Sequence, residues 1–199
     1  MSGSWARRGV YETAEIAGLV IIQPQVFEDG RGYFFESFSQ RRFEEAIGTT
    51  IGRTMSTALF VQDNESKSSY GVVRGLHYQI APYAQAKLVR VVKGRIWDVA
   101  VDLRRGSATF GKYAGVELSE ANKWQFFIPK GFAHGFAVLS EEAVVQYKCD
   151  DYYMPQAEGG ISFDDPELAI DWKIPREDMV LSPKDLNRPG LRDAYVFDV

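Results

Sequence analysis

Short stretches in which apolar and polar residues alternate recur along most of the chain, and glycine, proline or small polar residues separate them. Alternation with a period of two is the pattern of a strand that buries one face. Many short strands divided by turn residues predict an all-β sandwich or barrel. The clearest of these stretches are residues 87–92, 95–103, 109–118, 123–139 and 142–153.

Two of these stretches, 87–92 and 95–103, are separated only by Lys93-Gly94. Two β-rich runs joined by so short a turn predict a tight hairpin. The second strand is expected to present one apolar face that carries Trp97, Val99, Val101 and Leu103.

The clearest helical pattern covers residues 39–48. Ser39 is the predicted N-cap, and Gly48 is the predicted end of the helix. The apolar face would be formed by Phe43, Ala46 and Ile47. We expect this short helix to lie at the periphery of the β-structure.

Composition narrows the class of protein. With 199 residues, 45% of them hydrophobic, and no linker-like segment, residues 1–199 are expected to form one domain. The net charge is -4 and no run of Lys and Arg exceeds two residues, which argues against binding to nucleic acid polymers or to anionic membranes. Cys149 is the only cysteine, and neither an export signal nor an 18-residue apolar stretch is apparent. We therefore expect a soluble, cytoplasmic protein.

Strand parity turns two polar residues toward the predicted interior. His134 has the parity of Phe132, Phe136 and Val138, so a strand would direct it to the apolar side. By the same argument Tyr147 faces inward, since it shares its side with Ala143, Val145 and Cys149. Each residue taken alone has an ordinary interpretation as a hydrogen-bonded core residue.

His77 is the only other histidine of the chain. In a regular strand it would share a face with Val73, Gly75 and Gln79, and Gly75 would leave space beside it, while Arg74, Leu76 and Tyr78 would point the other way. Lys87 begins an apolar strand, where it either reaches out to water or enters the interior. A histidine, a lysine and a tyrosine that converge supply a base, an oxyanion stabiliser and a proton donor. This set suits proton abstraction next to a carbonyl group.

A metal site is the alternative use of histidine. Such sites draw on two or more imidazoles or a close set of carboxylates, often as HxH or HxxxH. After His77 the sequence has Tyr78 and Gln79 where a second histidine would stand, and there is no cysteine pair. We therefore expect no catalytic metal.

Several long motifs occur together: FEDGRGYFFES, QDNESKSSYGVVRGLHYQ, KLVRVVKGRIWDVAVDLRRGSATFGKY, IPKGFAHGFAVLSEEAVVQYK and DDPELAIDW. In this order they resemble the dTDP-4-dehydrorhamnose 3,5-epimerase family over roughly residues 18–193. The segment IPKGFAH is also similar to the second motif of the wider cupin group, whereas the metal-binding HxH of the first cupin motif is missing. The resemblance implies a cupin-type jelly-roll barrel with short peripheral helices, and it leaves residues 1–17 as an unassigned extension.

The resemblance also implies the chemistry. The enzymes of this rhamnose pathway work without metal or cofactor on a dTDP-4-keto-6-deoxyhexose and invert C3 and C5 to give dTDP-4-dehydro-L-rhamnose. By motif, His77 is the base, Tyr147 the proton donor on the opposite face, and Asp185 the carboxylate that orients the base. Lys87 and His134 are suited to stabilise the enolate oxygen by positive charge or hydrogen bonds. The binding positions that the resemblance implies are Arg31, Glu36, Gln62, Asp63, Asn64, Arg74, Lys87, His134, Glu158 and Lys184.

The resemblance further implies a homodimer in which the segment around Arg31 and Glu36 reaches the neighbouring subunit's site. Two departures stand near the site: Ala86 replaces the usual glycine before the lysine, and Trp124-Gln125 replaces a common Arg-Gln. Three alternatives stay open. They are a C3-only or C5-only epimerase or keto-isomerase, a non-enzymatic carbohydrate-binding jelly roll, and a metal-dependent cupin oxygenase.

Overall fold

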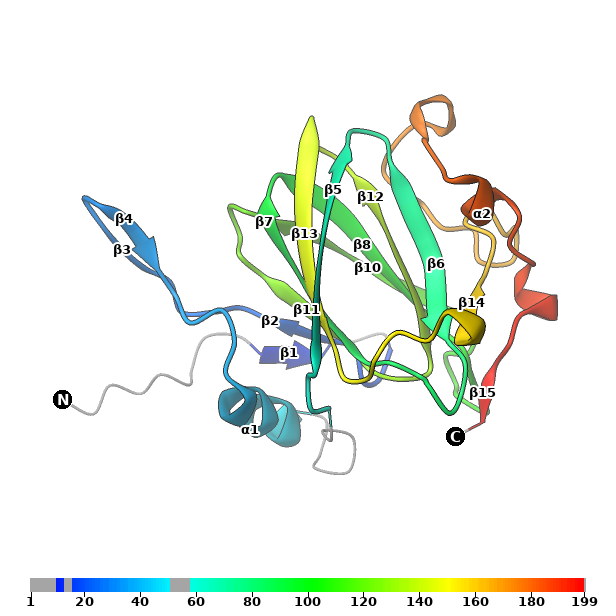
Figure 1. The fold of residues 1–199 in the computed structure, drawn as a ribbon, viewed down its shortest axis with the longest axis horizontal. Helices are drawn as coiled ribbons and strands as arrows, with labels where there is room; N and C mark the ends of the chain where they lie inside the picture. The colour runs from blue at the N-terminus through cyan, green and yellow to red at the C-terminus, as the bar shows by residue number, and fades with distance from the viewer. Residues whose placement is uncertain (1–9, 13–15, 51–57, 199) are drawn as a thin grey trace.

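Strands dominate the computed structural model, which describes residues 10–12, 16–50 and 58–198 (Figure 1). Most of the N-terminal extension therefore lies outside the described residues. Two α-helices, α1 (Gln40–Thr50) and α2 (Pro183–Leu186), accompany the sheets. The strands are β1 (Val10–Glu12), β2 (Val20–Ile22), β3 (Phe27–Asp29), β4 (Gly32–Phe34), β5 (Gln62–Ser69), β6 (Val73–Gln79), β7 (Lys87–Lys93), β8 (Arg95–Asp102), β9 (Arg104–Arg105), β10 (Tyr113–Ser119), β11 (Gln125–Ile128), β12 (Phe132–Val138), β13 (Glu142–Cys149), β14 (Glu158–Gly160) and β15 (Phe197–Asp198).

Two antiparallel sheets form the body of the fold. One has six strands in the order β1-β2-β11-β7-β13-β5, and the other has five in the order β10-β8-β12-β6-β14. Strands close in sequence repeatedly fall in different sheets, so the chain crosses between the layers. The architecture is the cupin-type jelly roll expected from the sequence.

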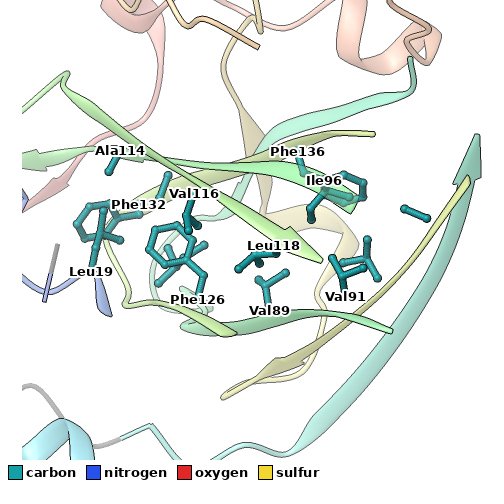
Figure 2. Close-up of a cluster of buried hydrophobic side chains, with 14 of the residues drawn as sticks. Leu19, Val89, Val91, Ile96, Ala114, Val116, Leu118, Phe126, Phe132 and Phe136 are labelled. Carbon is teal, nitrogen blue, oxygen red and sulfur yellow. The ribbon is translucent and has the colours of Figure 1, made fainter. Parts of the chain in front are cut away.

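The main hydrophobic core fills the space between the two sheets, where side chains from both inner faces meet (Figure 2). Val89 and Val91 come from the six-stranded sheet, and Phe132, Phe136 and Val138 come from the five-stranded sheet. The predicted inward parity is thereby confirmed for β12. In β13, Ala143 and Val145 belong to the same core, and Tyr147 packs against it.

The predicted hairpin at Lys93-Gly94 is wrong. β7 pairs with β11 and β13, whereas β8 pairs with β10 and β12, so the two strands lie in different sheets. The turn residue was correctly identified, because Gly94 has a φ of +78° and a Cβ there would lie 2.0 Å from the Glu142 carbonyl oxygen. A short turn predicts a change of direction but does not decide which sheet the next strand joins.

The outer face of the five-stranded sheet carries a second core. Val99, Val101 and Leu103 are fully buried there and Trp97 packs against them, as the alternation of this strand predicts. The C-terminal segment covers this face and contributes Ile161, Phe163, Leu168, Trp172, Leu191 and Phe197. This packing places α2 beside β6 (Figure 1).

Helix α1 begins directly after Ser39, whose carbonyl oxygen accepts a hydrogen bond from the Phe43 N–H at 2.8 Å. Phe43 and Ile47 are buried in a third core on the outer face of the six-stranded sheet, while Ala46 is only half-buried. The predicted end at Gly48 is wrong, since the helix continues to Thr50. A glycine inside a helix costs only about 1 kcal/mol, which the packing of the apolar face offsets.

The β3–β4 hairpin stands away from the two sheets (Figure 1). Its aromatic residues remain exposed, with Phe27 at 43%, Tyr33 at 59% and Phe34 at 65%. In the part of the chain that the structure describes, no helix combines the length and apolar character needed to cross a membrane.

Candidate active site

The two histidines lie side by side on the inner face of the five-stranded sheet. His77 of β6 is the register partner of His134 of β12, and on its other side it faces Gly160 of β14. Directly opposite residues of paired strands point to the same face of a sheet. The register therefore brings both imidazoles and the inner side of β14 together.

Strand β6 is irregular, which corrects the expected grouping of His77 with Val73. Val73 lies in the outer core together with Leu76 and Tyr78, and the pairing with β12 shifts register between His134 and Phe136. The irregularity falls at Gly75, where a Cβ would lie 2.5 Å from the Gly135 Cα atom. Gly75 thus permits close contact between β6 and β12 and does not leave open space beside His77.

His77 is paired with Asp185. The His77 Nε2–H donates to Asp185 Oδ1 at 2.5 Å, and the exposed fractions of the two side chains are 33% and 5%. The other oxygen, Oδ2, accepts a hydrogen bond of 2.9 Å from the Ser182 hydroxyl at the N-cap of α2. Burial raises the pKa of Asp185, but the bond and charge of His77, together with Ser182 and Arg188, outweigh it and hold the pKa below its usual value. Among the described residues His77 Nδ1 has no hydrogen-bond partner, and the ring is partly exposed.

His134 is paired with Asp98 in a closed environment. Its Nε2–H donates to Asp98 Oδ1 at 2.5 Å, and the side chains are 9% and 0% exposed. Burial lowers the pKa of His134, the Asp98 carboxylate opposes that shift, and the charges of Lys87 and His77 add to it. Asp98 Oδ2 is buried and has no hydrogen-bond partner among the residues that the structure describes.

Lys87 and Tyr147 occupy the inner face of the opposite sheet. In the β13–β7 ladder Cys149 is opposite Lys87 and Tyr147 is opposite Val89, and the Lys87 Nζ lies 5.9 Å from the centre of the Tyr147 ring. Burial lowers the pKa of Lys87, although Cys149, Asp98 and Glu158 raise it. Burial and Cys149 raise the pKa of Tyr147, against the charge of Arg74. The phenol is therefore held protonated at neutral pH.

The neighbouring edge strand β5 contributes polar side chains to this inner face. Asn64 is opposite Tyr147 in the β13–β5 ladder, its Nδ2 group donates to the Cys149 sulfur at 3.7 Å, and its Oδ1 accepts from Gln62 Nε2 at 3.0 Å. Asp63 has the opposite parity, is exposed, and pairs with Lys148 at 2.8 Å. The structure thus brings Gln62 and Asn64 to Tyr147, and it places Asp63 on the outer face.

Arg74 reaches from β6 toward β5, where its Nε donates to the Ser68 hydroxyl at 3.0 Å. Arg74 is opposite Phe136 in the β12–β6 ladder, and Phe136 belongs to the core between the sheets, so Arg74 lies on the same side as the converging polar residues. The side chain is exposed in this chain. A guanidinium in this position is available to an anion that approaches the histidines.

Glu158 is held at the other edge, next to β6. Its carboxylate accepts hydrogen bonds from Lys184 Nζ at 2.5 Å, from the Tyr153 hydroxyl at 2.7 Å, and from Arg188. Burial raises the pKa of Glu158, but these three donors outweigh it and lower the pKa to about 2. The carboxylate is therefore ionised and oriented.

Arg31 and Glu36 are not brought to this cluster within the chain. Arg31 is 90% exposed on the β3–β4 hairpin and pairs with Asp29 at 2.6 Å. Glu36 pairs with Arg42 at 3.2 Å and is 41% exposed.

Sequence reasoning missed Asp98, Tyr153 and Arg188. Asp98 carried a signal, because it has the inward parity of Ile96 and Ala100 and a carboxylate among such residues needs a partner. Tyr153 and Arg188 lie in irregular segments, where no periodicity indicates direction. In the described ranges, no group of three or more histidine, cysteine, aspartate or glutamate side chains is arranged to hold a metal ion.

The arrangement provides a histidine oriented by a carboxylate on one sheet, and a protonated tyrosine with a lysine on the facing sheet. A planar ring bound between the sheets would meet a base on one side and an acid on the other. The lysine supplies positive charge where an enolate oxygen would form.

Comparisons with known proteins agree with this geometry. The profile of the dTDP-4-dehydrorhamnose 3,5-epimerase family matches residues 13–193. A dTDP-4-dehydrorhamnose 3,5-epimerase from Shigella flexneri is 51% identical over 183 residues, which cover 92% of this chain and 96% of that protein.

A solved dTDP-6-deoxy-D-glucose-3,5-epimerase from Legionella pneumophila Philadelphia 1, in complex with dTDP-4-keto-L-rhamnose, superimposes with a TM-score of 0.86. It is 50% identical, and the match covers 93% of each chain. A dTDP-4-dehydrorhamnose 3-epimerase from Streptomyces niveus is 40% identical over 179 residues, 90% of this chain and 82% of that protein.

Proposed function

The chain belongs to the dTDP-4-dehydrorhamnose 3,5-epimerase family, and from that premise we propose that it inverts C3 and C5 of dTDP-4-dehydro-6-deoxy-D-glucose to give dTDP-4-dehydro-L-rhamnose. It is an isomerase, and both inversions replace a proton next to the C4 ketone. The observation that carries the proposal is the oriented His77–Asp185 pair on the inner face of one sheet, with Tyr147 on the inner face of the other.

His77 is the base. Its Nε2–H is bound to Asp185, so Nδ1 carries the lone pair that removes the proton. The Asp185 carboxylate fixes this tautomer and stabilises the imidazolium that forms. Since the pKa of Asp185 is held below its usual value, the carboxylate stays ionised throughout the neutral range.

Tyr147 is the proton donor on the opposite side of the sugar ring. Its pKa is raised by burial, so the phenol is protonated and delivers a proton rather than removing one. Inversion needs delivery from the face that the base does not reach. A base and an acid on facing sheets meet that requirement for both carbons.

Lys87 stabilises the enolate oxygen. Asp98 and Glu158 oppose the lowering of its pKa by burial, which favours the ammonium form. With its pKa lowered, His134 is neutral, and because its Nε2–H is bound to Asp98, Nδ1 is an acceptor. We therefore assign the positive charge to Lys87 and a hydrogen bond with a substrate hydroxyl to His134.

The remaining predicted contacts bind the nucleotide part and the sugar. Arg74 suits the diphosphate, since a guanidinium makes forked, charge-assisted hydrogen bonds with phosphate oxygens. We assign further substrate contacts to Gln62, Asn64, Glu158 and Lys184, in agreement with the sequence motifs. Asp63, which the motifs also include, points away from this face and is assigned no substrate contact within the chain.

We also propose a homodimer. The β3–β4 hairpin extends from the body in Figure 1 and carries exposed aromatic residues, and Arg31, between its two strands, is 90% exposed. A second copy that receives this hairpin would bury the aromatic rings and bring Arg31 and Glu36 to the partner's site. The single cysteine of the chain is compatible with a reducing cytoplasm, which we propose as the place of action.

The function is tested by incubating the protein with dTDP-4-keto-6-deoxyglucose in D2O and following the sugar by NMR. Deuterium at C3 and C5 together with the inverted product is expected. Exchange and inversion at one carbon only would mean that the protein is a mono-epimerase. The Streptomyces niveus relative is named as a 3-epimerase. Absence of any exchange would refute enzymatic epimerisation.

The Tyr147→Phe variant tests whether one sheet supplies the base and the other supplies the proton donor. The ring and its packing remain, so His77 still forms the enolate and deuterium still enters. Without the hydroxyl, reprotonation comes mostly from the face that the proton left, and configuration is retained. Formation of inverted product at the wild-type rate would remove Tyr147 from the role of donor.

A further inference from the structure

Arg188 is a half-buried cation that the proposed reaction does not use. Its side chain is only 12% exposed, and one of its Nη2–H groups donates to Glu158 Oε1. Its Nε is buried and has no hydrogen-bond partner in the described part of the chain. Burying a guanidinium with an unsatisfied nitrogen costs free energy, so this position needs an explanation.

The surroundings are shaped to receive this side chain. Gly160 lies opposite His77 on the inner side of β14, and a Cβ at position 160 would lie 2.7 Å from Arg188 Nε and 2.9 Å from its Cδ. The guanidinium stem therefore occupies the space that a larger residue at 160 would fill. Arg188 lies against the same short strand that carries Glu158.

Arg188 also acts on the catalytic pair. Asp185 is hydrogen-bonded to His77 from β6 and to Ser182 at the start of α2, and the charge of Arg188, from the segment after α2, also acts on it. Removal of Arg188 would take away the permanently charged group that acts on that carboxylate. The same side chain thus contacts Glu158 and acts on Asp185.

The other two donors to Glu158 are less fixed. Lys184 is 57% exposed and Tyr153 is 47% exposed, and both bond to Oε2. Arg188 alone binds Oε1 from a buried position. The orientation of the carboxylate therefore depends mainly on Arg188, because a buried donor has little freedom to move.

We propose that Arg188 is a positioning residue of the epimerase, which fixes Glu158 for substrate binding and joins it to the His77–Asp185 pair in one charge network. The inference rests on the proposed function, in which Glu158 contacts the substrate. It differs from a purely structural ion pair in its expected effects on binding and on the titration of Asp185.

The first test compares Arg188→Ala with Arg192→Ala by steady-state kinetics on dTDP-4-keto-6-deoxyglucose. Arg192 is a matched control, since it lies in the same segment, loses the same charge, and is 82% exposed in a pair with Glu167. Arg188→Ala is expected to raise KM about 10-fold, with a smaller fall in kcat, while Arg192→Ala retains wild-type constants. An Arg188→Ala enzyme with unchanged KM would overturn the positioning role, even if its unfolding midpoint fell.

Arg188→Lys keeps the charge but supplies a point donor in place of a planar fork. We expect a KM between those of the wild type and Arg188→Ala, and this variant carries the kinetic test if the alanine variant does not fold. Combining Arg188→Ala with Glu158→Gln gives a double-mutant cycle. Because both changes act through one contact, their effects on KM should be strongly non-additive, and additive effects would contradict the proposal.

A second measurement needs no turnover. The carboxyl carbon of Asp185, followed by 13C NMR, should titrate at higher pH in Arg188→Ala than in Arg192→Ala, because a nearby cation stabilises the carboxylate. Identical titrations would refute the shared charge network. If the wild-type protein exchanged no deuterium, the proposed function and the substrate-binding part of the inference would fail, while this titration would still decide the charge network between Arg188 and Asp185.

Discussion

The two histidine–aspartate pairs lie next to each other on one sheet and share the same bond, a 2.5 Å contact from Nε2 to an aspartate oxygen. Their surroundings differ. The His77 side chain is 33% exposed and its partner is fixed by Ser182, whereas His134 and Asp98 are only 9% and 0% exposed. One oxygen of Asp98 has no hydrogen-bond partner among the described residues. The same two residue types thus form an accessible pair and a closed pair.

The difference shows that a histidine–carboxylate contact does not by itself define a base. Access decides which ring nitrogen reaches a substrate, and burial decides whether the ring carries charge. Burial lowers the pKa of His134 and keeps the ring neutral, while the His77 side chain is 33% exposed to solvent. We therefore expect substitutions in the two pairs to affect different measured quantities.

The largest difference is expected in deuterium exchange. His77→Ala removes the base and should reduce exchange at both C3 and C5 by at least about 10²- to 10⁴-fold. His134→Gln retains a hydrogen-bonding side chain in the closed pair and should lose much less exchange, measured by NMR in D2O. A comparable loss in both variants would break the distinction between the pairs.

The free energy of unfolding should show the opposite order, with the larger loss in the His134–Asp98 pair. Asp98→Ala leaves the buried His134 N–H without an acceptor, which is expected to cost about 1–3 kcal/mol in the free energy of unfolding. Asp185→Ala should cost less through His77, because water reaches that partly exposed ring. Urea unfolding curves of the two variants provide the measurement, and equal losses would show that exposure does not separate the pairs.

The pH dependence of stability sharpens the comparison. The pKa of His134 is lowered below 6.5 in the folded state, so the unfolded chain binds more protons below about pH 6.5, and stability falls as the pH drops from there. The pKa of Asp185 is lowered below 3.8, so its contribution is present above that value and is lost only as the pH falls further. Each group gives a slope of at most about 1.4 kcal/mol per pH unit.

His134→Gln should flatten the first slope and leave the second, as measured by urea unfolding at a series of pH values. Asp185→Asn should do the reverse. A slope near pH 6 that persists in His134→Gln would assign the protonation to another group.

The smallest expected effect is that of a chelator. EDTA should leave both exchange and inversion unchanged, since the assigned roles need only side chains. Loss of turnover that one divalent cation restores would mean that one of the pairs is a metal ligand set instead.

Much of the fold could be predicted from local alternation, and some of it could not. Parity correctly directed His134 and Tyr147 inward, because each lies in a regular strand whose neighbours are apolar. It failed for Val73, since the register shift at Gly75 changes the face of the strand, and the cause of that shift is contact with β12. The hairpin at Gly94 failed for a related reason: strand pairing depends on distant segments.

The residues of the candidate site also include some that the sequence could predict and some that it could not. The family resemblance supplied roles for His77, Asp185 and Tyr147, and the structure places the first two in contact. Asp98 was foreseeable from its inward parity. Arg188 was not, because it lies in an irregular segment, 30 residues from its partner Glu158 at the start of β14.

Cys149, at the end of β13, has a practical consequence. The thiol is 1% exposed, faces Lys87 across the ladder, and has a pKa raised to about 11, mainly by burial. A protonated, covered sulfur reacts with neither alkylating agents nor disulfide reagents, so its labelling rate should report how often the β7–β13 ladder opens. Modification of the chain's only thiol therefore measures local opening of the sheet that carries Lys87 and Tyr147. An inhibitor that binds between the sheets should slow this modification.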